Sequence, residues 1–172
     1  MKIFLTACFA LLLCSYGSYS QPLQPNQEIY KKAGIFADSL IRAYEFQNWD
    51  TYLSLSYSGA VKYYGGKAGY LQHVQRARKK DEDLIDQPMP TFKIIQLEND
   101  IDEWQCVVEK TTSRLLDGKP SMVISYLLGQ SLDDGLTWKF FDVSQNAVSN
   151  VIYMMPDVFT NLAIPESRIV KL

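Results

Sequence analysis

An eight-residue stretch with the pattern S-x-D-x-G-x-T-W, from Ser131 to Trp138, constrains the fold of this chain more than any other feature. It lies between two apolar segments that are rich in β-branched and aromatic residues. Asp133 can accept hydrogen bonds from the N–H groups of a turn, and Gly135 can adopt the positive φ of a tight reversal. Trp138 then begins a new apolar strand. The stretch therefore predicts a β-hairpin.

The second half of the chain is typical of an antiparallel meander. Segments of strand-forming residues alternate with short turn sequences that contain Asn, Asp or Gly. Such short connections make neighbouring strands antiparallel. The expected strands are Phe92–Glu98, Trp104–Leu116, Lys119–Gln130 and Thr137–Val143. The expected turns are Asn99-Asp100, Asp117-Gly118 and Asp133–Gly135.

The first half of the chain has apolar residues at helical spacing, and Gly65-Gly66 separates two of the helical stretches. Pro88 and Pro90 end the last of them. The expected helices are one with its N-cap at Asn26 that ends near Asn48, a shorter one capped by Asp50, and one from about Lys67 to Ile85. A helical turn or two is expected before Pro156, followed by an extended tail. Helices followed by a meander indicate an α+β fold.

The N-terminus is typical of an export signal. A lysine precedes the apolar run Ile3–Leu13, and Ser18 and Ser20 fit a cleavage site before Gln21. The expected division is a signal peptide over residues 1–20 and a single α+β domain over residues 21–172. The mature protein is then exported, in a periplasm or as a secreted protein.

Leu11–Cys14 also fits a lipoprotein box, so a lipid anchor on Cys14 is the alternative to free export. No later segment is long and apolar enough to be a transmembrane helix. The formal net charge of −2 and the absence of a basic stripe argue against nucleic acid as a partner. Two of the three cysteines lie in the leader. Cys106 is therefore expected to be a buried, inert thiol without an intrachain disulfide.

Helices followed by a curved meander resemble the nuclear transport factor two-like superfamily, whose cystatin-like fold closes helices over a concave sheet to form a cone. The matching motifs are Ala43-Tyr44, Asn48-Trp49-Asp50, Tyr64-Gly65-Gly66-Lys67, Ser131–Asp142 and Ile164-Pro165. The likeness covers roughly Glu28 to Pro165 and is strongest to exported bacterial members. It implies a cone with a pocket and implies little about activity, because the superfamily contains isomerases, dehydratases and non-catalytic binding domains. The chain departs from that pattern in two ways. It shows no small hairpin between the second and third helices, and the family's catalytic Asp, Tyr and His sets have no matching positions.

No set of residues specifies a reaction, so we predict no catalytic residue, no metal ligand and no cofactor. His73 is the only histidine, and a partly exposed structural role is expected for it. The four carboxylates within residues 98–103 lack the ordered spacing and the glycine of a calcium loop, which indicates a solvated turn. Arg78 and Glu82 are expected to form an ion pair on the surface of the third helix.

Aromatic side chains are numerous enough to line a hollow. Tyr126 alternates with Met122, Ile124 and Leu128 onto one face of a strand, while Tyr44 ends the inward stripe of the first helix. These two faces are expected to meet around a mainly apolar pocket. Its expected lining is Tyr44, Trp49, Tyr63, Trp104 and Tyr126.

The expected function is that of a non-catalytic exported domain that binds a small apolar or peptide-like ligand, or a protein partner, in a cone-shaped pocket. One alternative is an isomerase or dehydratase that uses a buried carboxylate facing tyrosine hydroxyls. Another is a structural module whose sheet face is covered by a second copy in a homodimer. An ionisable pair in the pocket favours the enzyme, and a pocket of aromatic residues alone favours binding.

Overall fold

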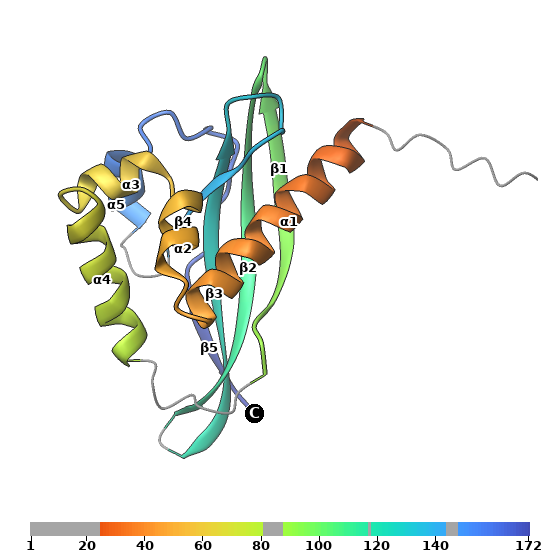
Figure 1. The fold of residues 1–172 in the computed structure, drawn as a ribbon. Helices are drawn as coiled ribbons and strands as arrows, with labels where there is room; N and C mark the ends of the chain where they lie inside the picture. Colours follow the sequence, from red (N-terminus) through yellow and green to blue (C-terminus); the bar gives the residue numbers. More distant parts are fainter. Residues whose placement is uncertain (1–24, 81–87, 117, 144–147) are drawn as a thin grey trace, which may run out of the picture.

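The computed structural model describes residues 25–80, 88–116, 118–143 and 148–172. Within these residues the chain is α+β, with helices packed against a strongly curved antiparallel sheet that forms a half-barrel (Figure 1). The predicted fold class is therefore confirmed. The expected signal peptide, Cys14, Glu82 and Asp117 lie outside the described residues.

The helices are α1 (Pro25–Glu45), α2 (Trp49–Leu55), α3 (Ser58–Tyr63), α4 (Lys67–Lys80) and α5 (Val148–Met154). Both predicted N-caps are wrong. Asn26 is already helical and follows Pro25 within α1, so it does not cap this helix. Asn48 caps α2 in place of Asp50, since its side-chain oxygen accepts a hydrogen bond from the Thr51 N–H at 3.2 Å.

The strands are β1 (Thr91–Asp100), β2 (Glu103–Leu116), β3 (Lys119–Ser131), β4 (Lys139–Asp142) and β5 (Arg168–Lys171). The sheet order is β1-β2-β3-β4, and every pairing is antiparallel. The four predicted strands are thus confirmed. The tail, which was expected to be only extended, adds β5. This short strand pairs with Ser121–Ile124 of β3, and its residues are all exposed.

The S-x-D-x-G-x-T-W stretch forms the predicted turn between β3 and β4. Asp133 accepts hydrogen bonds from the Ser131 hydroxyl at 2.7 Å and from the Thr137 N–H and hydroxyl at 2.8 and 2.6 Å. Gly135 has a φ of 76°, and Trp138 is fully buried. The motif therefore builds a turn whose polar groups satisfy one another.

Asp133 is expected to make this turn sensitive to acid. Burial alone would raise the pKa of its carboxyl group, but the hydrogen bonds from Thr137 and Ser131 outweigh that effect and lower the pKa below its ordinary value of 3.8. A carboxylate of this kind stabilises the fold above the unfolded-state pKa, and its contribution is lost as pH falls through the folded-state pKa. We expect Asp133→Asn to reduce the free energy of unfolding by about 1 kcal/mol at neutral pH, since the turn is partly solvated. Urea denaturation at a pH about one unit below 3.8 should show a smaller difference. An equal difference at both pH values would contradict the charge-based explanation.

Different parts of the chain cover the two faces of the sheet. Alternate residues of β2 point to opposite faces. Lys110 lies with Leu40 and Ile41 of α1, which defines the helix face of the sheet. Gln105 contacts residues 155–167, called here the strap, which defines the strap face. The sheet therefore lies between α1 and the strap.

A buried amide fastens the strap to the sheet. Gln105 is completely buried, donates to the Asp157 carbonyl at 2.8 Å and accepts from the Phe159 N–H at 2.9 Å. Gln96 holds the strap further along by accepting from the Ala163 N–H at 2.8 Å. These bonds satisfy backbone groups that a loop across a sheet would otherwise leave unpaired.

Candidate functional site

Two adjoining hollows lie between the helices and the helix face of the sheet, and both are bounded by Tyr52 and Asp142. Each is small, with free room for about one water molecule. The first, called here the tyrosine hollow, is lined by Tyr52, Ala60, Tyr64, Tyr70, His73, Val74, Phe141, Asp142 and Met154. The second, called here the lysine hollow, is lined by Leu40, Ile41, Tyr44, Glu45, Tyr52, Lys110, Leu127 and Asp142.

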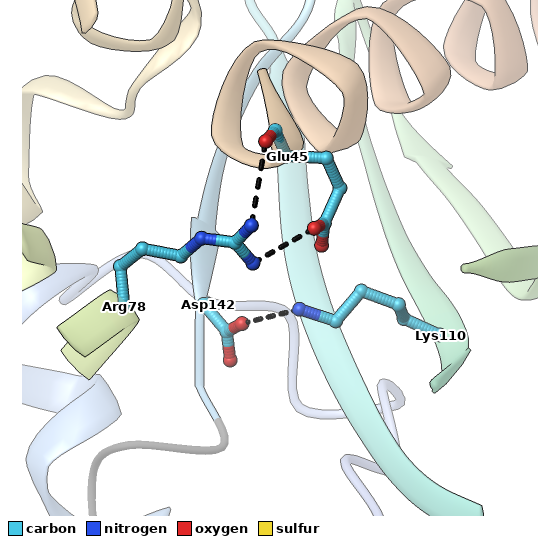
Figure 2. A network of polar contacts seen from close by, with 4 residues as sticks. All are labelled: Glu45, Arg78, Lys110 and Asp142. Atoms are coloured by element: carbon cyan, nitrogen blue, oxygen red, sulfur yellow. Dashed lines mark hydrogen bonds and ion pairs between the residues drawn. The ribbon is translucent and has the colours of Figure 1, made fainter. Parts of the chain in front are cut away.

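Two largely buried ion pairs lie at these hollows (Figure 2). Lys110 of β2 contacts Asp142 of β4 at 2.9 Å, and both side chains are only 15% exposed. Arg78 of α4 contacts the Glu45 carboxylate at the end of α1 at 2.8 Å, with side chains 20% and 19% exposed. Arg78 also donates to the Glu45 carbonyl at 3.4 Å. The four charges come from four different elements and compensate one another.

Tyr44 lies between the two pairs. The Arg78 guanidinium carbon is 5.4 Å from the centre of its ring, and the Lys110 ammonium nitrogen is 5.7 Å from it. Both distances are within the range of cation–π attraction. Trp49 and Tyr52 contact the same ring at centroid distances of 6.3 and 5.9 Å. The ring therefore joins the charged groups to the aromatic cluster.

Tyr52 and Tyr70 both line the tyrosine hollow and share a side-chain hydrogen bond. Burial raises the pKa of Tyr52 well above its ordinary value, and Tyr70 and Asp142 raise it further. Burial also raises the pKa of Tyr70, although hydrogen bonds with Tyr52 and Ser56 partly oppose that effect. Both phenols consequently stay neutral near neutral pH and keep a proton that can be donated.

Local sequence features position these side chains. The Asn48 cap starts α2, which carries Tyr52, and the Tyr57 N–H donates to the Phe140 carbonyl at 2.8 Å. That bond fixes the end of α2 beside β4, the strand that carries Asp142. Gly65 and Gly66 have φ values of 81° and 95°, which allows the sharp turn into α4.

His73 follows Tyr70 by one helical turn, so both side chains reach the same hollow. Its ring stacks on Tyr64 with a centroid distance of 4.0 Å. The side chain is half-buried, in keeping with the predicted partial exposure.

The structure separates the five residues that were expected to line one pocket. Tyr44 and Trp49 are half-buried and in ring contact, and of the two only Tyr44 lines the lysine hollow. Tyr63 is 45% exposed and packs on Tyr64, outside both hollows. Trp104 is buried at the other end of the helix face, where its indole N–H donates to Asp134 at 3.1 Å.

Tyr126 lies on the opposite face of the sheet from Tyr44, contrary to the expectation that both face one pocket. It pairs with Glu109, and its hydroxyl lies 3.5 Å from that carboxylate, whereas Lys110, the next residue of β2, contacts Tyr44. One step along a strand reverses the direction of the side chain. The expectation that Tyr126 and Tyr44 meet across one hollow is therefore wrong. That any of the five residues contacts a ligand stays a prediction.

Sequence reasoning missed most of the residues that build the site. It expected Arg78 to pair with Glu82, which lies outside the described residues, and it did not foresee the bond from Arg78 to Glu45, 33 residues away. Lys110 and Asp142 are separated by 32 residues. Alternation along each of the two strands does not say which of their faces coincide, so the sequence carries no direct signal for this pairing.

Cys106, metal clusters and membrane-spanning helices were the remaining features considered from the sequence. Cys106 is fully buried and burial strongly raises the pKa of its thiol, which confirms the predicted buried cysteine. Among the described residues, no cluster of three or more His, Cys, Asp or Glu side chains is arranged to hold a metal ion. Within the same part of the chain, no helix is long and apolar enough to cross a membrane.

Comparisons of the chain with protein-family models, curated proteins and solved structures found no match. The resemblance to the nuclear transport factor two-like superfamily therefore stays a prediction.

Proposed function

We propose that this protein is an exported, non-catalytic domain that binds a small polar ligand in the tyrosine and lysine hollows. The observation that carries the proposal is the shared wall. Tyr52 and Asp142 bound both hollows, and the Lys110 ammonium lies 2.9 Å from Asp142. Convergent polar groups within a mainly apolar surround are typical of small-molecule sites.

The energetics support a role beyond stability. Removing two charges from water costs several kcal/mol, and a buried ion pair is often no more stabilising than apolar residues of the same volume. A purely structural core has no need of Lys110 and Asp142 beside two buried tyrosine hydroxyls. Their presence is explained if they recognise hydrogen-bonding groups of a ligand.

The shape of the hollows narrows the ligand class. The expected ligand was apolar or peptide-like, but the observed lining offers carboxylates, an ammonium and phenol hydroxyls. The free room of about one water molecule requires a ligand of few heavy atoms, or movement of the side chains at the rim. We therefore place small hydroxylated or carboxylated molecules ahead of lipids and peptides.

The test is a titration of the protein with a panel of small carboxylic acids, amines and polyols. The NMR signals of the tyrosine and histidine rings report binding. A compound that shifts His73 and Tyr70 is expected. Its affinity should fall about tenfold in Tyr52→Phe, because one hydrogen bond to a buried hydroxyl is lost. Tyr153→Phe is the matched control, since Tyr153 is 68% exposed on α5.

A second variant separates recognition from folding. Replacing Lys110 by Met together with Asp142 by Leu removes both charges at once, so neither is left buried without its partner. The double variant is expected to fold and to lose binding. If the double variant and Tyr52→Phe both bind the compound as tightly as the unchanged protein does, the hollows are not the binding site.

Acid–base catalysis is the second candidate function, and one observation favours it. His73 and Asp142 line the tyrosine hollow together with the neutral phenols of Tyr52 and Tyr70. These groups include proton donors and proton acceptors, as general acid–base catalysis requires. The engagement of Asp142 by Lys110 favours binding over catalysis, because a general base has to be free to accept a proton. Recovery of the identified compound after long incubation decides between them. An unchanged compound supports binding, and an isomerised or dehydrated one supports catalysis.

A further inference from the structure

The ends of the sheet are its most accessible parts. The helix face is packed under α1, and the strap covers the opposite face. The edge strand β1 has an irregular register between Ile94 and Gln96, and the Tyr30 hydroxyl donates to the Ile94 carbonyl at 3.2 Å. Such irregular and occupied edges resist pairing with another strand.

One end of the sheet combines exposed apolar side chains with acids. The β1–β2 and β3–β4 turns form one surface, because the Asp134 N–H donates to the Asp102 carbonyl at 3.1 Å. This surface, called here the acidic end, carries no Lys or Arg within residues 98–103 and 131–137. Its exposed apolar residues are Ile101 (85%), Leu132 (70%) and Leu136 (58%). Its acids are Glu98, Asp100, Asp102, Glu103, Asp133 and Asp134.

Ile101 is the most exposed of these apolar residues and has a φ of 54°. A β-branched side chain resists this left-handed conformation, and asparagine or glycine adopts it more readily. Neither solvation nor local backbone geometry therefore favours isoleucine here. A contact made by its side chain would account for it.

The opposite end of the sheet also has exposed apolar residues, but the charged residues around them are mainly basic. The Leu172 N–H donates to the Pro120 carbonyl at 3.1 Å, so β5 and the β2–β3 hairpin form one surface, called here the basic end. The sequence also places two acids at this end, Glu166 just before β5 and Asp117 in the β2–β3 turn, of which Asp117 lies outside the described residues. The exposed apolar residues of this end are Leu115 (48%), Ile169 (58%), Val170 (37%) and Leu172 (73%). Its bases are Arg114, Lys119, Arg168 and Lys171.

The two ends face away from one another along the same hairpin. Figure 1 shows the β1–β2 turn at one extremity and the β2–β3 turn, with the C-terminus, at the other. The β2–β3 ladder between them runs from the Trp104–Ser131 pair to the Leu116–Lys119 pair. This length of strand spans about 40 Å, so the two ends of one molecule cannot contact each other.

We propose that the acidic end of one copy of this chain docks on the basic end of a second copy. Apolar side chains at each end would be removed from water, and the surrounding charges are complementary. Two acidic ends or two basic ends repel one another, so the contact joins unlike surfaces. Contacts of this type build open chains or closed rings.

The contact is expected to be modest in affinity and sensitive to salt, because exposed ion pairs contribute little and are screened. Sedimentation velocity over an about hundredfold dilution series should show a mass at least twice that of the monomer at high concentration and low ionic strength. The mass should fall toward that of the monomer on dilution or in about 0.5 M salt.

Charge reversal supplies the decisive arm of the experiment. Asp100→Lys with Asp102→Lys lowers the formal charge of the acidic end from −6 to −2, because four acids then stand beside two lysines. Lys119→Glu with Lys171→Glu leaves two bases beside two new acids at the basic end. Each double variant alone is expected to associate more weakly than the unchanged protein. A mixture of the two is expected to associate more strongly than either variant alone, a rescue that misfolded variants cannot produce.

Ile101→Asn tests the apolar contribution separately. It should weaken association without loss of folding, since asparagine tolerates the left-handed conformation. An unchanged protein that is monomeric throughout the series would overturn the proposal. Association that neither charge reversal weakens, or a mixture that associates no more strongly than either variant alone, would overturn it equally.

Discussion

Gly135→Val is expected to lower the free energy of unfolding by about 3 kcal/mol. Two costs add. A β-branched residue resists the φ of 76°, at about 1–2 kcal/mol. A side chain at this position would also begin 2.8 and 2.9 Å from two carbon atoms of Ile29, which is buried in α1. Forcing that packing apart costs about 1–3 kcal/mol. Thermal and urea denaturation measure the loss.

Gly118→Val is the matched control for this variant. Gly118 has a similar φ of 72°, but a side chain there would meet nothing within 4 Å. It should therefore lose only the conformational part, about 1–2 kcal/mol. Equal losses in the two variants would show that the turn between β3 and β4 does not support α1.

Gln105→Leu is expected to release the strap and to reduce the free energy of unfolding by about 3 kcal/mol. Leucine has a similar volume but cannot bond the Asp157 carbonyl or the Phe159 N–H. It also leaves Glu103, which accepts from the Gln105 amide at 2.6 Å, with one bond fewer. Buried groups left without partners cost about 1–3 kcal/mol each.

Hydrogen exchange of the Phe159 N–H measures the local effect, which should be faster in Gln105→Leu than in the unchanged protein. Gln96→Leu is the control. Its bond to the Ala163 N–H is exposed, so water can replace it, and a loss below about 1 kcal/mol is expected. Protection of Phe159 that survives Gln105→Leu would contradict the fastening role of this amide.

The fold could be predicted where its causes are local. Turn residues such as Gly135 and Gly118 and the period-two segments between them specify a meander without knowledge of the rest of the chain. Predictions failed where two local signals competed. Asn48 and Asp50 are both good N-caps, and the sequence gives no means of choosing between them. The strand β5 is too short and too exposed to produce a pattern.

The candidate site could not be predicted because its groups meet only through tertiary structure. Tyr44 lines the lysine hollow and contacts both cations, whereas Tyr126 lies on the strap face, away from Tyr44. Face assignment from alternation is reliable along a strand, but which face the helices cover depends on long-range packing. The pairing of Lys110 with Asp142 depends on that same packing.

Native mass spectrometry of the purified protein tests the proposed ligand site most directly. We expect a small polar molecule of defined mass to be bound to the native protein and to be released on denaturation. The same molecule should be retained by Tyr153→Phe and lost from the variant with Lys110→Met and Asp142→Leu. Two results would contradict a ligand site at Tyr52 and Asp142. Either the protein releases no compound, or both variants retain the compound equally.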